Sequence, residues 1–195
     1  MGRVVRAVGR RRARIEAGER GAALIEAAIL MPVVLLIIFG AIEFSSLFKD
    51  AATLSSAARA GGRTASAESR NPNMPTDTAA AVGTALSSLP TDSPQRLYVY
   101  DATSSSSAPA DCSGNCVSFT WDKSSKTFVA DSYSAQSPPS WVTNQNVCGG
   151  AGAWARVGVW VQADHSFVTN LFGATRTLTS TAIFRMEPLP SSQCG

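Results

Sequence analysis

The pattern of apolar and polar residues changes character along the chain. From Ala27 to Ile42 (AAILMPVVLLIIFGAI) no residue is charged, and a helix over this stretch is about 24 Å long at about 1.5 Å per residue. With residues 22–25 and Phe44 added, such a helix crosses the roughly 30 Å hydrocarbon core of a bilayer. The pattern therefore predicts a single membrane-spanning helix near the N-terminus.

The helical pattern continues beyond the apolar stretch, but there it has only one apolar face. Small or apolar residues recur at alternating spacings of three and four, which is typical of an amphipathic helix; they are Phe44, Leu47, Ala51, Leu54, Ala58 and Gly61. We therefore expect the helix to continue past the membrane. Pro32 removes a backbone donor inside the span, which predicts a kink that neighbouring helices accommodate.

A short second helix and a set of strands are predicted for the rest of the chain. Pro72 and Pro75 interrupt the first helix, Thr76 to Thr78 offer oxygens for a new N-cap, and Pro90 ends the second helix. Beyond it the apolar period becomes two and turn residues separate short runs, which indicates strands. The predicted strands cover residues 97–100, 117–121, 127–130, 157–161 and 177–186.

These elements predict an α+β fold. An antiparallel sheet with one apolar face needs a cover, and the amphipathic face from Phe44 to Ala58 is the most available one. The Ser- and Pro-rich segments 102–110 and 132–140 are too polar for a core and are expected to be solvent-facing loops.

Positive charge is concentrated at the N-terminus. The 195 residues include 17 Lys and Arg and 14 Asp and Glu, for a net charge of +3. Residues 1–21 contain seven arginines and two glutamates (+5), so residues 22–195 contribute 10 − 12 = −2. This excludes a basic nucleic-acid-binding domain. Under the positive-inside rule the N-terminus stays in the cytoplasm and the chain beyond residue 43 lies outside.

Glu26 is the residue that a plain membrane anchor does not explain. A carboxylate one turn inside an apolar helix costs roughly 2.5 to 3.5 kcal/mol on insertion scales, so it is usually paired or functional. If a peptidase cuts after Gly21, Ala22 carries a free amine and Glu26 becomes the fifth residue of the mature chain. The two groups then share a helix face. In a helical stack, the carboxylate of one subunit would neutralise the amine of its neighbour and set the register.

Two simpler interpretations compete with this one. A secretory signal peptide needs a small-x-small cleavage site just past its apolar region, but the nearest candidate, residues 58–60, follows three charged residues. An uncut membrane anchor fits the hydropathy equally well, although it leaves Glu26 without a role.

The sequence resembles the TadE-like minor pilins, or pseudopilins, of the tight-adherence (Tad) type IV pilus system. The segments that carry the resemblance are Arg20-Gly21, Glu26, Met31 to Leu36, Phe39 to Phe44, Ala57 to Arg63 and Thr177 to Glu187. Gly61-Gly62 departs from the family pattern, which more often has a larger residue before the glycine. The continuity of the helix at this point is therefore open.

The resemblance implies a pilin-like plan in three parts: a basic cytoplasmic leader (residues 1–21), a transmembrane and assembly helix (22–67), and an extracytoplasmic α+β domain (68–195). A prepilin peptidase would remove the leader, and the mature protein would start or cap an adhesive Tad pilus rather than act as an enzyme. The implied partners are this peptidase, other Tad pilins and minor pilins, the inner-membrane assembly platform and membrane lipid. No cofactor is implied.

An alternative function is a pilus-displayed adhesin or DNA-capture module whose activity lies in the region from Cys112 to Cys148. The aromatic residues predicted to be exposed for such binding are Tyr133 and Trp141, whereas at least two of the four tryptophans are expected in the core. Nucleic acid is otherwise not an expected partner.

All four cysteines follow the predicted span; they are Cys112, Cys116, Cys148 and Cys194. An even number in an oxidising compartment predicts two disulfides, with three possible connectivities. The pairing of Cys112 with Cys116 and Cys148 with Cys194 is favoured, because the tail after Pro190 has little else to hold it. The other two pairings stay open.

Residues for catalysis or metal binding are not evident in the sequence. No G-x-S-x-G or Walker motif occurs. The single histidine, His165, is expected to be an ordinary surface or loop residue. It is not expected to bind zinc together with cysteines, because structural zinc sites prefer closer cysteine pairs and reduced thiols.

Overall fold

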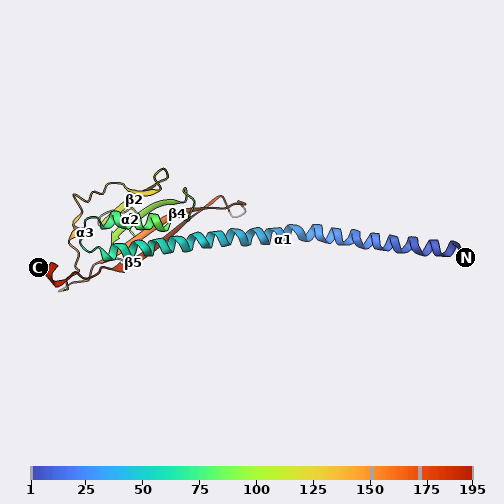
Figure 1. Cartoon of the computed structure of the whole chain (residues 1–195), viewed down its shortest axis with the longest axis horizontal. Coiled ribbons are helices and arrows are strands. Elements are labelled where there is room, and N and C mark those ends of the chain that lie inside the picture. Colours follow the sequence, from blue (N-terminus) through green and yellow to red (C-terminus); the bar gives the residue numbers. More distant parts are fainter. Residues whose placement is uncertain (1, 150–151, 171–172, 195) are drawn as a thin grey trace. The chain divides into compact units, whose positions relative to one another are not determined.

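The computed structural model describes residues 2–149, 152–170 and 173–194, with side chains from residue 21 onward. The chain divides into two compact units, residues 1–45 and 46–195. In chain order (Figure 1), the elements are α1 (Gly2–Ala67), α2 (Met74–Ala85), β1 (Pro94–Asp101), β2 (Cys116–Asp122), β3 (Thr127–Ala130), α3 (Ser140–Thr143), β4 (Arg156–Ser166), β5 (Thr175–Arg185) and the 3₁₀ turn η1 (Ser191–Gln193).

The second unit is built on one antiparallel sheet. In the described part of the chain this sheet has five strands in the order β3-β2-β1-β4-β5. Val99 in the central strand β1 lies opposite Val117 of β2 on one side and Val159 of β4 on the other. The predicted strands and the α+β class are confirmed, because the period-two pattern marked each strand.

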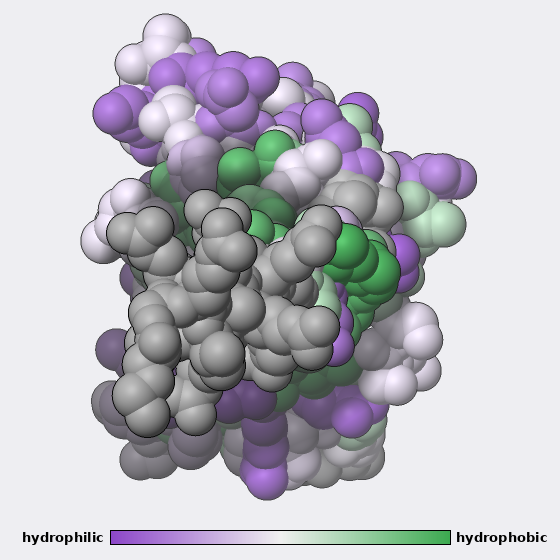
Figure 2. Space-filling view, turned by 90° about the vertical axis from the view of Figure 1, so that its right-hand side faces the viewer, coloured by the Kyte–Doolittle hydropathy of each residue, from purple (hydrophilic) through white to green (hydrophobic). Residues whose placement is uncertain are grey.

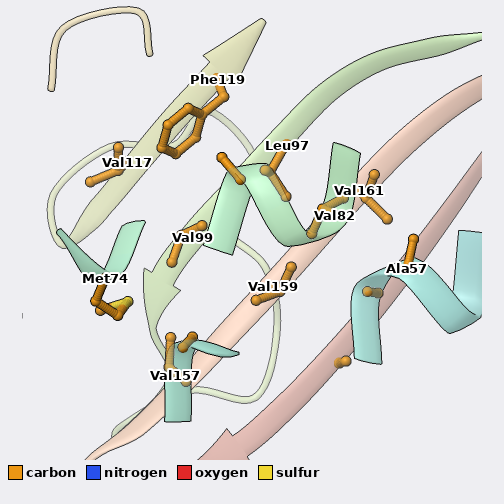
Figure 3. Packing of buried hydrophobic residues seen from close by; sticks show 14 of the residues in the cluster. Ala57, Met74, Val82, Leu97, Val99, Val117, Phe119, Val157, Val159 and Val161 are labelled. Carbon is orange, nitrogen blue, oxygen red and sulfur yellow. The ribbon is translucent and has the colours of Figure 1, made fainter. Parts of the chain in front are cut away.

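The main core lies between this sheet and two helices. Leu54, Ala57, Ala58 and Ala65 of α1 are buried, so the prediction that its amphipathic face covers the sheet is confirmed. In Figure 3, Val82 of α2 points toward the sheet near Val159 and Val161. Burial in this core begins at Leu54, since the first residue of the predicted face, Phe44, is 45% exposed.

Gly61 and Gly62 do not interrupt α1, which is helical through Ala67. A Cβ atom at Gly61 would overlap the side chain of Val82, and one at Gly62 would overlap the ring of Phe184. The two glycines therefore allow α1 to approach α2 and β5 closely. This contact offsets the helix-propensity penalty of about 1 kcal/mol per glycine.

The N-cap predicted for α2 is wrong. The helix begins at Met74, and its N-cap is Asn73, whose side chain makes no capping hydrogen bond. Pro75 lies inside the first turn, where a missing N–H group costs little, instead of preceding the helix. The Thr76 hydroxyl donates to the carbonyl of Asn73 at 2.7 Å. The helix ends at Ala85, before the predicted boundary at Pro90.

The sheet is partly buried on its second face as well, although the sequence pattern indicated one buried face. A smaller cluster there contains Tyr98, Tyr100 and Ala102, with Trp160 packed against it. The rings of Tyr98 and Trp160 stack with centroids 4.6 Å apart. A Cβ atom at position 158 would overlap the Tyr100 ring, so Gly158 makes room for it.

Candidate assembly interface

The apolar part of α1 has an exposed hydrophobic surface. Large apolar side chains from Leu24 to Phe48 are exposed, and none of the most hydrophobic window of this helix is buried. Among the described residues, α1 is the one helix that is long and apolar enough to cross a membrane. In Figure 2, green hydrophobic residues are visible next to purple hydrophilic ones. A continuous apolar surface of this size indicates contact with lipid or with other helices.

Gly21 and Ala22 are helical, and the position of Gly21 has no steric requirement for glycine. A Cβ atom built at Gly21 meets no atom within 4 Å, and the same holds for Gly40. Gly61 and Gly62 are different, because neighbouring side chains fill the space that a Cβ atom would take. The packing of the chain therefore does not explain why residue 21 is a glycine.

Glu26 and Pro32 both lie within the exposed apolar part of α1. The Glu26 side chain is exposed, and within the described residues no hydrogen bond or ion pair is found for it. The helix continues through Pro32. A lone carboxylate on an apolar helix surface lacks the compensation that such a group needs in a low-dielectric environment.

The apolar N-terminal helix fits a single-pass membrane anchor, and it precedes an α+β domain. Residues 21–63 match the family model of TadE-like proteins, while no curated protein and no solved structure matches the chain. The chain thus carries a TadE-like domain at residues 21–63. The match indicates a component of a Tad pilus, and the family is one of structural pilus components.

Both disulfides are present, and they tie loops of the second unit. Cys112 pairs with Cys116 and Cys148 pairs with Cys194, with Cα atoms 5.2 Å and 5.5 Å apart. This is the connectivity that the sequence argument favoured. The second bridge holds the C-terminal tail, which also donates from the N–H of Leu189 to the carbonyl of Val147 at 3.3 Å.

The prediction for His165 is wrong, because this residue is buried in β4. Its side chain is 4% exposed, and Nδ1 lies 2.7 Å from Oδ2 of Asp50 on α1. Its ring and the ring of Phe167 form a T-shaped contact with centroids 5.0 Å apart. The inward alternation of β4, which includes Val157 and Val161, continues to position 165. That period-two signal was present in the sequence, whereas the partner Asp50 was not predictable from it.

The aromatic residues suggested for adhesion are not exposed as predicted. Trp141 is buried in α3, and Tyr133 is half-buried with its hydroxyl donating to the carbonyl of Pro72. Burial also raises the pKa of the Tyr133 hydroxyl. Of the four tryptophans, only Trp141 is fully buried, and the other three are half-buried. In the described part of the chain, no group of three or more His, Cys, Asp or Glu residues is placed to hold a metal.

Proposed function

We propose that this protein is a minor pilin, or pseudopilin, of a Tad-type pilus. It is inserted in the cytoplasmic membrane through α1, with the arginine-rich N-terminus inside and the disulfide-bonded domain outside. A prepilin peptidase removes residues 1–21, and the mature chain then takes part in starting or capping the pilus. The observation that carries the proposal is a lone carboxylate, Glu26, on an exposed apolar helix within the TadE-like match.

The assembly role follows from the electrostatics of the mature N-terminus. Cleavage after Gly21 creates an amine at Ala22, one helical turn from Glu26. In a bundle of such helices, the carboxylate of one subunit neutralises the amine of the next, and this compensates the cost of holding Glu26 in a low-dielectric environment. Pro32, which has no backbone N–H group to donate, lies in the same buried bundle.

The partners follow from the same scheme. Other Tad pilins and minor pilins supply the neighbouring apolar helices, and membrane lipid covers them before assembly. The prepilin peptidase acts on the segment around Gly21, and the inner-membrane assembly platform extracts the mature chain. The adhesin and DNA-capture alternative named Tyr133 and Trp141 as its exposed aromatic contacts, but Trp141 is buried and Tyr133 is half-buried.

Two glycine variants test the cleavage step. Gly21→Leu should leave the leader attached in cells that have the peptidase, because the enzyme must accommodate the residue before the scissile bond. Gly40→Leu is the matched control, since its Cβ also meets no atom within 4 Å, and it should be trimmed normally. Intact-mass analysis and N-terminal sequencing distinguish a chain that starts at Ala22 from one that retains residues 1–21. Normal trimming of the Gly21 variant, or a wild-type chain that keeps its arginines, contradicts the proposal.

A further inference from the structure

The segment between β1 and β2 has a composition that the proposed pilus role does not use. Five hydroxyl side chains follow one another from Thr103 to Ser107, and Pro109 comes two residues later. No charged residue occurs between Asp101 and Asp111. The four serines of the run are all exposed. We call these four residues, 104–107, the serine loop.

The N-terminal side of the serine loop is fixed to β4. Ala102 is fully buried, and its N–H group donates to the carbonyl of Arg156 at 2.8 Å. The Arg156 guanidinium donates from Nη2 to the carbonyl of Thr103 at 3.0 Å, and the Arg156 backbone N–H group donates to the Thr103 hydroxyl at 3.1 Å. The Thr103 hydroxyl is therefore already hydrogen-bonded, and the exposed run begins at Ser104.

The C-terminal side of the serine loop is fixed to the sheet as well. Ala108 packs against the smaller cluster on the second face of the sheet, and so does Cys112. The Cys112–Cys116 disulfide then closes the chain at the start of β2. Because the chain is held on both sides, the exposure of the serine loop belongs to the folded domain. Its hydroxyl groups can be reached without unfolding.

Three hydroxyl groups of the serine loop are available for a reaction. The Ser105 hydroxyl accepts a hydrogen bond from the N–H group of Ser107 at 3.2 Å. Among the described residues, no hydrogen bond is found for the hydroxyls of Ser104, Ser106 and Ser107. In the other Ser- and Pro-rich segment, residues 132–140, no two serines are adjacent. The serine loop is therefore the densest group of accessible hydroxyls in the two segments.

We infer that the hydroxyls of Ser104, Ser106 and Ser107 are acceptors of O-linked sugars. Segments rich in serine and threonine with proline are typical of O-glycosylated stalks. The sequence contains no Asn-x-Ser/Thr acceptor, so linkage through a side-chain amide is not expected. The inference rests on the proposed function, because a membrane-borne transferase reaches the serine loop only if the domain lies outside the cytoplasm.

The transfer is a substitution at the anomeric carbon of a lipid-linked sugar, whose carrier is a polyprenyl phosphate in the membrane. The serine Oγ forms a bond to the anomeric carbon, the bond from this carbon to the phosphate oxygen breaks, and the polyprenyl phosphate leaves with the electron pair. The hydroxyl proton passes to a base of the transferase. Exposed loop tips with small polar residues are preferred sites of proteolytic cleavage, so a bulky sugar protects this loop.

Intact-mass measurement of the protein from the membranes of its native cells tests this inference. We expect the wild-type mass to exceed that of the unmodified chain by whole hexose or N-acetylhexosamine residues. The variant Ser104→Ala/Ser106→Ala/Ser107→Ala should lose the whole excess, and it should fold normally because all three side chains are exposed. Electron-transfer fragmentation of the wild-type peptide locates the sugars.

A second triple variant is the matched control. Ser132→Ala/Ser134→Ala/Ser137→Ala changes three exposed serines of the other Ser- and Pro-rich segment and should keep the excess mass. Sugars found only outside the serine loop overturn the inference. Protease added to spheroplasts reports the topology separately. A domain that is digested but carries no sugar overturns the inference alone, whereas a domain that stays protected inside the cell contradicts the proposed orientation.

Discussion

Glu26 lies in an apolar stretch of sequence and His165 lies on the buried face of β4, and the two residues differ in their partners. His165 finds Asp50 within the chain, 115 residues away, and the pair is largely shielded from water. For Glu26 no ion pair is found among the described residues, and in the proposed function its partner is the N-terminal amine of a neighbouring subunit. The first pair joins β4 to α1 within the fold, whereas the second belongs to the proposed assembly.

The role of Glu26 leads to a prediction at this scale. Glu26→Ala should insert in the membrane at least as well as the wild type, because the cost of the carboxylate is removed. Its incorporation into sheared pili should fall more than about tenfold, since breaking a low-dielectric ion pair costs about 3 to 5 kcal/mol and about 1.4 kcal/mol corresponds to tenfold. Quantitative immunoblots of membrane and pilus fractions measure both. Glu26→Asp keeps the charge and serves as the control. Unchanged pilus incorporation of the alanine variant would rule out the pairing.

At the scale of the elements, the contact between α1 and α2 depends on the absence of side chains. Gly61 faces Val82 and Thr78 of α2, and Gly62 faces Phe184 of β5. The amphipathic pattern predicted which face of α1 is buried. It did not predict how closely the helix approaches its neighbours, because that distance depends on residues remote in the sequence.

This close approach predicts opposite effects for two glycine-to-alanine changes. Gly61→Ala should lower the free energy of unfolding by about 1 to 3 kcal/mol, because overpacking against Val82 outweighs the helix-propensity gain of about 1 kcal/mol. Gly83→Ala in α2 is the control, since its Cβ lies 3.7 Å from the Trp121 ring, an ordinary contact, and it should be neutral or stabilising. Urea unfolding of the chain in detergent measures both. A stabilised Gly61 variant would show that the two helices are not in such close contact.

At the scale of the whole molecule, the two disulfides close loops of very different length. The Cys112–Cys116 bridge spans a sequence separation of 4, and the Cys148–Cys194 bridge spans 46. The longer bridge joins the segment before β4 to the C-terminal tail beyond β5. It thereby encloses the β4–β5 hairpin, whose residues form much of the core.

Loop length predicts unequal effects of removing the bridges. In the chain-entropy model the Cys148→Ser/Cys194→Ser variant should lose about 4 kcal/mol of unfolding free energy, and the Cys112→Ser/Cys116→Ser variant about 2 kcal/mol. Denaturant unfolding of the oxidised proteins provides the comparison, and non-reducing peptide mapping verifies the remaining bridge. If the short loop proved the more important one, its packing against Tyr100 and Ala102 would dominate over chain entropy.

The sequence by itself determined the apolar helix that is long enough to span a membrane, the strands and the covered face of α1, because each of these depends on the local pattern of apolar residues. Its four cysteines limited the disulfides to three pairings and favoured the one that the structure contains. Only the tertiary structure decided that His165 pairs with Asp50, that Trp141 is interior, and that Gly61 is a contact point. These features depend on residues far apart in the chain, and local periodicity contains no information about which distant side chains meet.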